Sequence, residues 1–428
     1  MEKVDVIVVG AGPAGLSAAY FLAAEGVEVL VVDRGDYPGS KNVSGGRLYL
    51  NPVRSLFGDL WDEAPLERPV TKERLSVMSG EASTTVELTS QRLREEPYHS
   101  YTVLRSRFDR WLADRVAERG AIVVPKYEVE DLRLENGRVT GVRAAGEEIG
   151  ADVVVAADGA LSFVAEKAGL RDGHDPADFA VAVKEVIELP AGVIEDRFGV
   201  APGHGAAQLL FGAFTEGING GGFVYTNRES LSLGLVVNLK ALAEHDPPLA
   251  PHELLEQFKA RPEIEVLVRG GELVEYSAHA IPEGGFAKMP KLFGDGILVV
   301  GDAAGMALNL GLTVRGMDFA LASGAMAARA ILEAREQRDY SAATLSGYER
   351  LLGESFVLQD LKTFRHVPHF LENPRLFGLY PEAACRLLEN LLWVGEEPKE
   401  KLSATAWRDI RPLVGFATLR DLWASRKV

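Results

Sequence analysis

The arrangement of residues 4–33 constrains the fold more than any other feature of the chain. An apolar, β-branched run over 4–9 leads into the glycine pattern GAGPAG of residues 10–15, and an alanine- and leucine-rich segment follows. A second apolar run over 27–32 ends at Asp33. Strand, glycine turn, helix, strand and a terminal acidic residue, in this order, are typical of a dinucleotide-binding βαβ unit. The sequence therefore predicts a parallel sheet with a phosphate-binding loop.

Each glycine of the pattern has a separate expected role. Gly10 permits the tight turn, Gly12 lets a pyrophosphate approach the backbone, and Gly15 lets the helix pack on the strand. The N–H groups at the start of the helix receive the phosphate charge, and Asp33 accepts hydrogen bonds from the adenosine ribose. The residues that this unit contributes to the expected cofactor site are Gly10, Gly12, Pro13, Ala14, Gly15, Asp33 and Arg34.

Later segments distinguish FAD from a nicotinamide dinucleotide. A hairpin marked by Asn136-Gly137 precedes a strand expected over 152–156, which runs into an Ala-Asp-Gly turn. A second buried run near 298–300 ends in Gly-Asp. Together with the glycine pattern, these segments resemble the glutathione-reductase-type FAD fold, in its aromatic-hydroxylase branch. The resemblance implies that Asp302 binds a ribityl hydroxyl of FAD, whereas the plainer alternative is that this carboxylate only forms a turn.

The same resemblance assigns two further features. The first arginine of the R-x-x-F-D segment, here Arg105, reaches the FAD in that branch, and the helix after Thr313 directs its positive end at the flavin pyrimidine ring. A helix N-terminus stabilises negative charge there by about 0.3–1 kcal/mol. The further residues expected in the cofactor site are Lys41, Ser44, Gly45, Gly46, Arg105, Ala157, Asp158, Gly159, Gly301, Asp302, Gly311 and Thr313.

Four segments carry a closer resemblance: SKNVSGGR (40–47), EGINGGGF (216–223), NLGLTVRGMD (309–318) and PRLFGLYP (374–381). They look like the FixC-type flavoproteins, which are relatives of electron-transfer-flavoprotein:quinone oxidoreductase. The resemblance covers nearly the whole chain. It implies that the bound FAD takes electrons that originate in an electron transfer flavoprotein and passes them to a membrane quinone.

One departure from the fused quinone oxidoreductases concerns cysteine. Those enzymes carry a ferredoxin-like domain with a four-cysteine cluster, whereas Cys385 is the single cysteine here, so this chain cannot hold such a cluster. The resemblance implies that a separate small ferredoxin-like [4Fe-4S] subunit carries it. The other expected partners are the electron transfer flavoprotein subunits, a membrane quinone and a membrane surface.

Charge and hydropathy bound the location and the other partners. A net charge of −16 argues against nucleic-acid binding. No uncharged apolar run reaches about 18 residues, so no membrane-spanning helix is expected. We expect a cytoplasmic protein that lies peripherally on the inner face of the cytoplasmic membrane.

Two basic residues are candidates for tuning the flavin. Lys41 lies in a loop that should cross near the isoalloxazine, and Arg315 is expected in the first turn of the helix after Thr313. For each, the alternative is a solvated side chain. Ser44, Gly45 and Gly46 would leave room for the ring. The histidines show no metal-ligand spacing, and no general acid or base is evident from the sequence.

Two segments compete as the entry for a long apolar quinone. Residues 203–225 are glycine-rich and apolar, and residues 364–393 alternate basic and aromatic groups with prolines. Ordinary core packing is the alternative for both, as it is for a C-terminal helix with Phe416, Leu419 and Trp423 at helical spacing. The candidate quinone residues are Asn219, Gly221, Gly222 and Phe223.

The fold class expected is α/β with α+β character: a Rossmann-type FAD domain, an interleaved mixed or antiparallel sheet, and a C-terminal helical region. The FAD domain is expected over 1–75, 98–170 and 285–335, the quinone domain over 76–97 and 171–284, and the helical region over 336–428. Three other functions remain open at this point: a geranylgeranyl-type prenyl reductase, a flavin monooxygenase or halogenase, and a non-catalytic flavin-binding assembly subunit.

Overall fold

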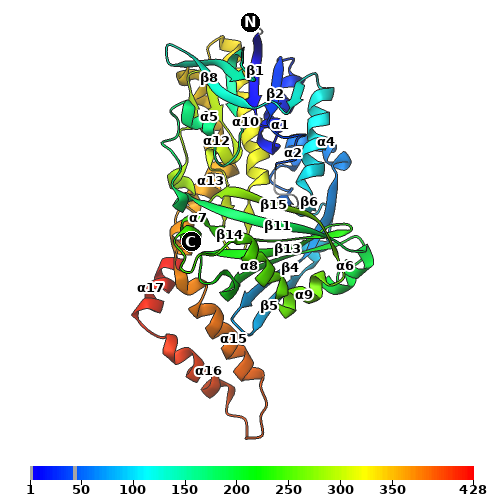
Figure 1. Cartoon of the computed structure of the whole chain (residues 1–428), viewed down its shortest axis with the longest axis vertical. Helices are drawn as coiled ribbons and strands as arrows, with labels where there is room; N and C mark the ends of the chain where they lie inside the picture. Colours follow the sequence, from blue (N-terminus) through cyan, green and yellow to red (C-terminus); the bar gives the residue numbers. More distant parts are fainter. Residues whose placement is uncertain (1–2, 42–45) are drawn as a thin grey trace.

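The computed structural model describes residues 3–41 and 46–428, which form two sheets, their covering helices and a helical C-terminal arm (Figure 1). The first sheet has the strand order β16-β17-β10-β1-β2-β7, with the hairpin β8–β9 beside β10. Its strands are β1 (Lys3–Val9), β2 (Val29–Asp33), β7 (Ile122–Pro125), β8 (Val129–Glu135), β9 (Arg138–Ala144), β10 (Glu147–Ala156), β16 (Phe293–Gly294) and β17 (Ile297–Val299).

The parallel strands of this sheet place three loops at one edge. β10, β1 and β2 are neighbours, and β17 pairs with β10 in parallel. Because the carboxyl ends of parallel strands share an edge, the glycine loop and the turns at 157–159 and 301–302 converge there. The apolar runs at 6–9 in β1 and 153–156 in β10 are buried, which fits strands that are covered on both faces.

Two helices pack against each other on this sheet. They are α1 (Pro13–Ala24) and α10 (Met317–Gln337). Small residues line the contact: a Cβ placed on Gly324 would lie 2.1 Å from the carbonyl oxygen of Ala14. The Ser17 hydroxyl donates to the Leu321 carbonyl oxygen at 2.6 Å across the same contact. Helices that begin near the same cofactor loops are thereby held at close range.

The second sheet has the order β15-β11-β14-β13-β12-β4-β6-β3, with β5 beside β4. One face packs on α6 (Ala191–Phe198), α8 (Pro251–Ala260) and α9 (Pro262–Val268), through a cluster that includes Phe198 and Phe258. Its strands are β3 (Gly46–Tyr49), β4 (Leu66–Met78), β5 (Ser83–Thr89), β6 (Ser100–Val103), β11 (Phe179–Glu188), β12 (Gly205–Gly212), β13 (Gly220–Thr226), β14 (Ser230–Asn238) and β15 (Glu272–Pro282).

Local structure agrees with the sequence-based predictions, but sheet membership differs in places. The fold class, the hairpin at 136–137 and the strand over 152–156 are confirmed. However, β3, β6 and the first part of β4 fall within ranges expected for the FAD domain and are hydrogen-bonded into the second sheet. Strand propensity shows that a segment is extended, but it does not show which partner the strand will take. The division into domains therefore stays a prediction.

The region after residue 336 is helical. α12 (Gly347–Glu354) packs on α10, and α13 (Phe356–Thr363) packs on α12. α15 (Leu379–Leu392), α16 (Leu402–Ile410) and α17 (Phe416–Ser425) project from the body as an arm (Figure 1). We call residues 379–428 the C-terminal arm. In the described part of the chain, no helix is both long and apolar enough to cross a membrane.

An ionic clamp attaches the end of the arm to its base. The Arg375 guanidinium donates to both carboxylate oxygens of Asp421 at 2.6 Å, and the Tyr380 hydroxyl donates to the same carboxylate. This pairing lowers the pKa of Asp421 below its ordinary range. The carboxylate is therefore charged at neutral pH, and its contribution to stability is lost only as the pH falls into the acidic range.

We expect Asp421→Asn to release α17 from the arm. The variant loses a bidentate, charge-assisted contact, of which each hydrogen bond is worth about 1.5–3 kcal/mol. Limited proteolysis should cut residues 411–428 several-fold faster, while the body remains resistant. Arg420→Gln, which changes an exposed neighbour, is the matched control. Equal cleavage of both variants would contradict the role of the clamp.

Candidate functional site

A cavity of about 990 Å³ runs between the carboxyl edge of the first sheet and the open face of the second. This volume lies at the upper end of the range for ligand and cofactor pockets. Its walls come from the glycine loop, the turn at 157–159, the hairpin of β18 (Leu308–Asn309) and β19 (Val314–Arg315), and residues 361–377. Segments that are far apart in the sequence thus meet around one space.

A different structural feature requires glycine at each of the three positions of the pattern. Gly10 has φ +108°, and a Cβ there would lie 2.3 Å from the Ala157 carbonyl oxygen. A Cβ on Gly15 would lie 2.1 Å from the Gly10 carbonyl oxygen. Gly12 has φ −89° and open space, because its nearest neighbour would be the Arg105 guanidinium at 3.7 Å. At Gly10 and Gly15, glycine is therefore needed because a side chain would collide with the backbone. Gly12 instead leaves room beside the Arg105 guanidinium for an anionic ligand.

Two carboxylates of the cavity wall, Asp33 and Asp158, accept hydrogen bonds from the loops around them. Asp33 accepts the N–H groups of Ala11 and Gly35 at 2.8 and 2.7 Å, and it lines the cavity. Asp158 accepts from Ser162 and from the Val164 N–H, so it helps to begin a short helix. Burial raises the pKa of Asp158. Each carboxylate thus fixes its loop while its residue faces the cavity.

Asp302 and Arg105 face the middle of the cavity. Burial raises the pKa of Asp302, and the Arg105 charge opposes this rise. Arg105 is itself held by Asp109, which accepts two hydrogen bonds at 2.8 and 2.9 Å. Among the described residues, none donates a hydrogen bond to the Asp302 carboxylate. A buried carboxylate of this kind fits a ligand that brings its own hydroxyl donors.

These observations test whether FAD fits the residues that are present. The start of α1 offers N–H groups without a side-chain cap, beside Gly12 and Arg105. Phosphates suit that position, and a polyol chain suits Asp302. The phosphate position beside Gly12 and the polyol position beside Asp302 belong to the same cavity. The residues therefore fit FAD, with Arg105 and the α1 start toward phosphate and Asp302 toward the ribityl chain.

Most of the residues expected from the sequence line this cavity, but some do not. Gly15, Gly301 and Thr313 are not in its wall. Gly15 and Gly301 instead allow close packing of the backbone: a Cβ on Gly301 would lie 2.7 Å from the Ala14 side chain. Ser44 and Gly45 lie outside the described residues. The expected residues in the wall are Gly10, Gly12, Pro13, Ala14, Asp33, Arg34, Lys41, Gly46, Arg105, Ala157, Asp158, Gly159, Asp302, Gly311, Arg315, Asn219, Gly221, Gly222 and Phe223.

The expectation for Arg315 needs correction. Arg315 is the last residue of β19 and precedes the helix, which begins at Met317. Its guanidinium pairs with Asp318 and Asp360, each at 2.5 Å, and lies over the Phe319 ring. The strand pairing of the hairpin delays the helix start, which the sequence pattern did not reveal. Arg315 is therefore neither solvated nor an unbalanced positive charge, whereas Lys41 has an exposed side chain at the cavity wall.

Sequence reasoning missed polar residues that the fold brings into the cavity. Glu283 and His279, at the end of β15, line it, and burial beside cationic groups lowers the pKa of His279 to about 4. Arg47 also lines it and pairs with Glu73 from β4. The available signal for Glu283 was an acidic residue between an apolar strand and a Gly-Gly pair. The described residues contain no cluster of three or more histidine, cysteine or acidic side chains arranged to bind a metal.

Family models match three parts of the chain. Residues 3–193 match "FAD binding domain", residues 179–281 match "ETF-QO, ubiquinone-binding", and residues 367–427 match "ETF-QO/FixC family C-terminal domain". Together, the fold, the cavity and these matches define an FAD-dependent oxidoreductase.

Whole-chain relatives give the family. Protein FixC of Escherichia coli K12 is 44% identical over 97% of this chain and 96% of its own. The probable electron transfer flavoprotein-quinone oxidoreductase YdiS of the same organism is 43% identical over 93% and 92%. Protein FixC of Azotobacter vinelandii is 38% identical over 97% of both chains. The chain belongs to the family of FixC and the electron-transfer-flavoprotein:quinone oxidoreductases, as the sequence motifs predicted.

Solved structures share the fold at lower identity. A geranylgeranyl bacteriochlorophyll reductase-like protein from Thermoplasma acidophilum superimposes with a TM-score of 0.73 and 23% identity, over 99% of this chain and 100% of the other. The myxobacterial chondrochloren halogenase CndH gives a TM-score of 0.66 and 20% identity, over 98% and 97%. These likenesses confirm the overall fold.

Proposed function

We propose that this protein receives electrons that originate in an electron transfer flavoprotein and passes them, through its FAD, to a membrane quinone. The observation that carries the proposal is the continuity of the cavity: the space beside Asp302 leads on to a wall of apolar side chains. A quinone has a small polar head and an apolar tail, which suit such a cavity. The apolar residues of this wall include Val236, Ile281, Val314, Phe364, Phe370, Leu376 and Phe377.

Both segments proposed for quinone entry contribute to this wall. The glycine-rich segment supplies Phe223 and the Gly221-Gly222 backbone, where a Cβ on Gly222 would lie 2.8 Å from the Phe258 ring. The C-terminal segment supplies aromatic side chains at 364–377. We propose that the second sheet receives the quinone head and that residues 364–377 receive the tail. Bound FAD supplies one- and two-electron transfer.

The electron donor proposed here is a separate iron–sulfur subunit. Cys385, the single cysteine of the chain, is buried, and its thiol faces the Val77 and Ala82 carbonyl oxygens. A [4Fe-4S] cluster needs four thiolates, and these 428 residues contain one cysteine. We propose that this partner is a small ferredoxin-like subunit that receives its electrons from the electron transfer flavoprotein subunits.

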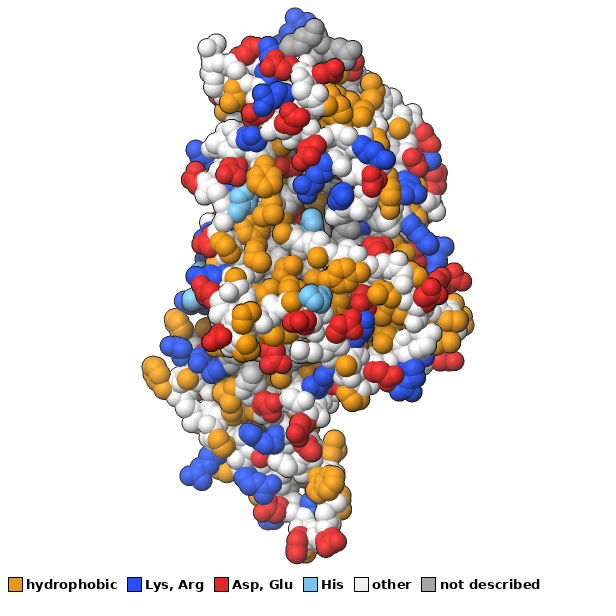
Figure 2. Space-filling view, in the orientation of Figure 1, with side chains coloured by type: hydrophobic (Ala, Val, Ile, Leu, Met, Phe, Trp, Pro, Cys, Tyr) orange, Lys and Arg blue, Asp and Glu red, His pale blue; other side chains and the backbone are white. Residues whose placement is uncertain are grey.

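We propose that the C-terminal arm places the protein on a membrane surface. Large apolar side chains are exposed along it, among them Phe416 (85%) and Leu392 (77%). Figure 2 shows apolar and basic side chains on the arm, with acidic side chains among them and at its lower tip. In residues 401–428 the acidic Asp409 and Asp421 are buried, whereas the basic side chains lie outside. Exposed apolar and basic groups on one helical surface favour binding to anionic lipid.

The membrane assignment predicts a large loss of vesicle binding from two substitutions. We expect Phe416→Ser with Trp423→Ser to lower the affinity for anionic vesicles at least 10-fold, because two exposed aromatic groups no longer enter the lipid. Co-sedimentation with vesicles of mixed anionic and zwitterionic lipid measures this. Val86→Ser with Leu88→Ser, on exposed β5, is the control. Binding equal to the parent protein would exclude the arm as the contact.

Anaerobic stopped-flow tests the electron-transfer proposal. Protein pre-reduced at its FAD is mixed with a short-chain menaquinone or ubiquinone analogue, and the oxidised-flavin absorbance is followed. We expect rapid, saturable reoxidation. Reoxidation by oxygen with no response to quinone would overturn the proposal and favour a prenyl reductase or a monooxygenase. A protein whose flavin exchanges electrons with neither acceptor would instead be a flavin-binding assembly subunit.

A further inference from the structure

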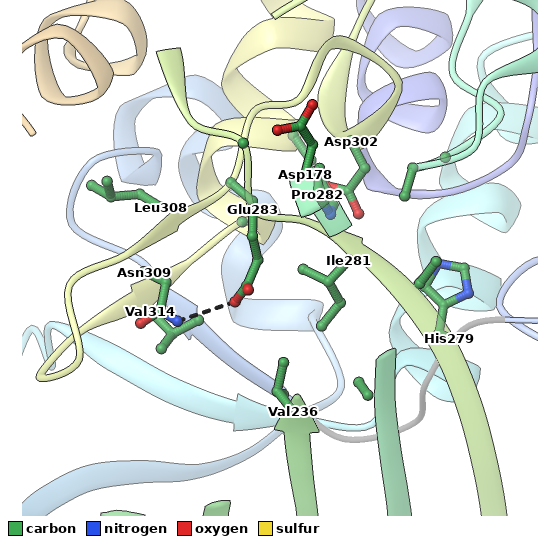
Figure 3. A pocket seen from close by; sticks show the side chains of 18 of the residues that line it. Asp178, Val236, His279, Ile281, Pro282, Glu283, Asp302, Leu308, Asn309 and Val314 are labelled. Carbon is green, nitrogen blue, oxygen red and sulfur yellow. Dashed lines mark hydrogen bonds between the residues drawn. The ribbon is translucent and has the colours of Figure 1, made fainter. Parts of the chain in front are cut away.

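A carboxyl group lies inside the cavity at the end of β15. The Glu283 N–H donates to the Asp178 carbonyl oxygen at 2.8 Å, which fixes the backbone. Its side chain accepts a hydrogen bond from the Asn309 Nδ2 at 3.2 Å, as Figure 3 shows. Asn309 Oδ1 accepts the Gly311 N–H at 2.9 Å. Because the amide oxygen is engaged there, the amide nitrogen faces Glu283.

The surroundings of this carboxyl are apolar. Ile281, Val236 and Val314 lie around it in Figure 3, and no cationic side chain among the described residues forms an ion pair with it. Burial raises the pKa of Glu283, and the Asn309 amide opposes this rise. A carboxyl in such a place favours its protonated form.

Two cationic side chains of the cavity wall have acidic partners of their own. Lys288 pairs with Asp178 at 3.0 Å, and Arg315 pairs with two acidic residues of its own neighbourhood. The titratable residues that line the cavity with Glu283, from all the elements packed around it, include Asp178, His279, Lys288, Asp302, Arg315, Arg365, His369 and Glu372. Glu283 is thus a carboxyl group that faces the cavity and forms no ion pair with a described residue.

We propose that Glu283 is the acid that delivers a proton to a carbonyl oxygen of the bound quinone. This inference rests on the proposed function. A quinone needs two electrons and two protons to become a quinol. Bound FAD, when reduced, would supply the two electrons and one proton. Glu283 supplies the second proton, and its O–H bond breaks as the quinol O–H bond forms. A proton from the solvent then restores the carboxyl group.

Asn309 is the positioning residue for this acid. Its Nδ2 group holds one carboxyl oxygen, and the Gly311 N–H holds the amide. The other carboxyl oxygen of Glu283 has no partner among the residues described, so it is the one available to a quinone. After proton transfer, the same amide N–H stabilises the carboxylate that remains.

Glu283→Gln tests the proposal, because glutamine keeps the shape and the contact to Asn309 but cannot release a proton. We expect quinone-dependent reoxidation to fall about 100-fold, the typical lower value for general acid catalysis. Reoxidation by ferricenium, an acceptor that takes one electron and no proton, should stay unchanged. FAD content and the affinity for an inactive quinone analogue should also stay unchanged.

Glu272→Gln is the matched control, since this exposed carboxylate lies at the other end of β15 and outside the cavity wall. It should leave both reoxidation rates at the level of the parent protein. If the parent protein does not respond to quinone, the proposed function fails. If it responds and Glu283→Gln is equally fast, only the role of Glu283 fails. An equal loss with quinone and ferricenium would show a structural role and would also overturn this inference.

Infrared difference spectroscopy supplies a readout that does not depend on turnover. The carbonyl-stretch region of protonated carboxylic acids should contain a contribution from Glu283 that is missing in Glu283→Gln and retained in Glu272→Gln. A spectrum of the parent protein without this contribution would overturn the proposal, even if the variant failed to fold.

Discussion

Gly12→Asp should give a folded protein that no longer retains FAD. The backbone at Gly12 has φ −89°, which any residue adopts, and a Cβ has room there. An aspartate would lie beside the Arg105 guanidinium and form an ion pair with it. It would also lie where the phosphates bind. A repulsion of about 4 kcal/mol between two charges at 4 Å and an effective dielectric constant of 20 weakens FAD binding by about three orders of magnitude.

Two measurements separate charge from bulk at this position. FAD content after purification and the FAD dissociation constant should collapse in Gly12→Asp, while the melting temperature of the apoprotein stays near that of the parent apoprotein. Gly12→Asn has the same shape without the charge and should retain clearly more FAD. A Gly12→Asp protein with full FAD content would contradict the assignment of this loop to the diphosphate.

Gly324→Ala should destabilise the protein by about 3 kcal/mol or more, although it adds one methyl group. The new Cβ would lie 2.1 Å from the Ala14 carbonyl oxygen and 2.9 Å from the Ser17 side chain, so α1 and α10 must separate. Overpacking of this kind typically costs 1–3 kcal/mol, and more where backbone is the obstacle. Separation also weakens the contact between Ser17 and Leu321. FAD content should fall as well, because both helices begin at the cofactor loops.

Gly353→Ala in α12 is the matched substitution, and we expect it to raise the free energy of unfolding instead of lowering it. A Cβ there meets nothing within 4 Å, so alanine should stabilise the helix by about 0.5–1 kcal/mol. Chemical denaturation of both variants, followed by far-ultraviolet circular dichroism, gives the two free-energy changes. Gly324→Ala with parent-like stability would show that the helices yield at this contact without cost.

The sequence by itself determined the cofactor unit and the family. Residues 4–33 form the predicted strand, turn, helix and strand because their glycine spacing and β-branched runs are local signals that few other folds satisfy. The sequence also marked Gly301-Asp302 as the end of a buried run. The role of Asp302 toward the ribityl chain came from the resemblance and stays a prediction. Motifs such as those at 309–318 and 374–381 likewise pointed to the family that the relatives confirm.

Only the tertiary structure decided which polar groups share the cavity and which are neutralised. Glu283 and Asn309 meet because β15 and the β18–β19 hairpin end at the same place, and no sequence spacing encodes that meeting. Arg315 was a candidate for an unpaired positive charge, but it forms ion pairs with Asp318 and with Asp360, a residue 45 positions away. The pairing of β3 and β6 with the second sheet is equally non-local. Local patterns specify elements, whereas long-range packing sets the burial and the partners on which charge and chemistry depend.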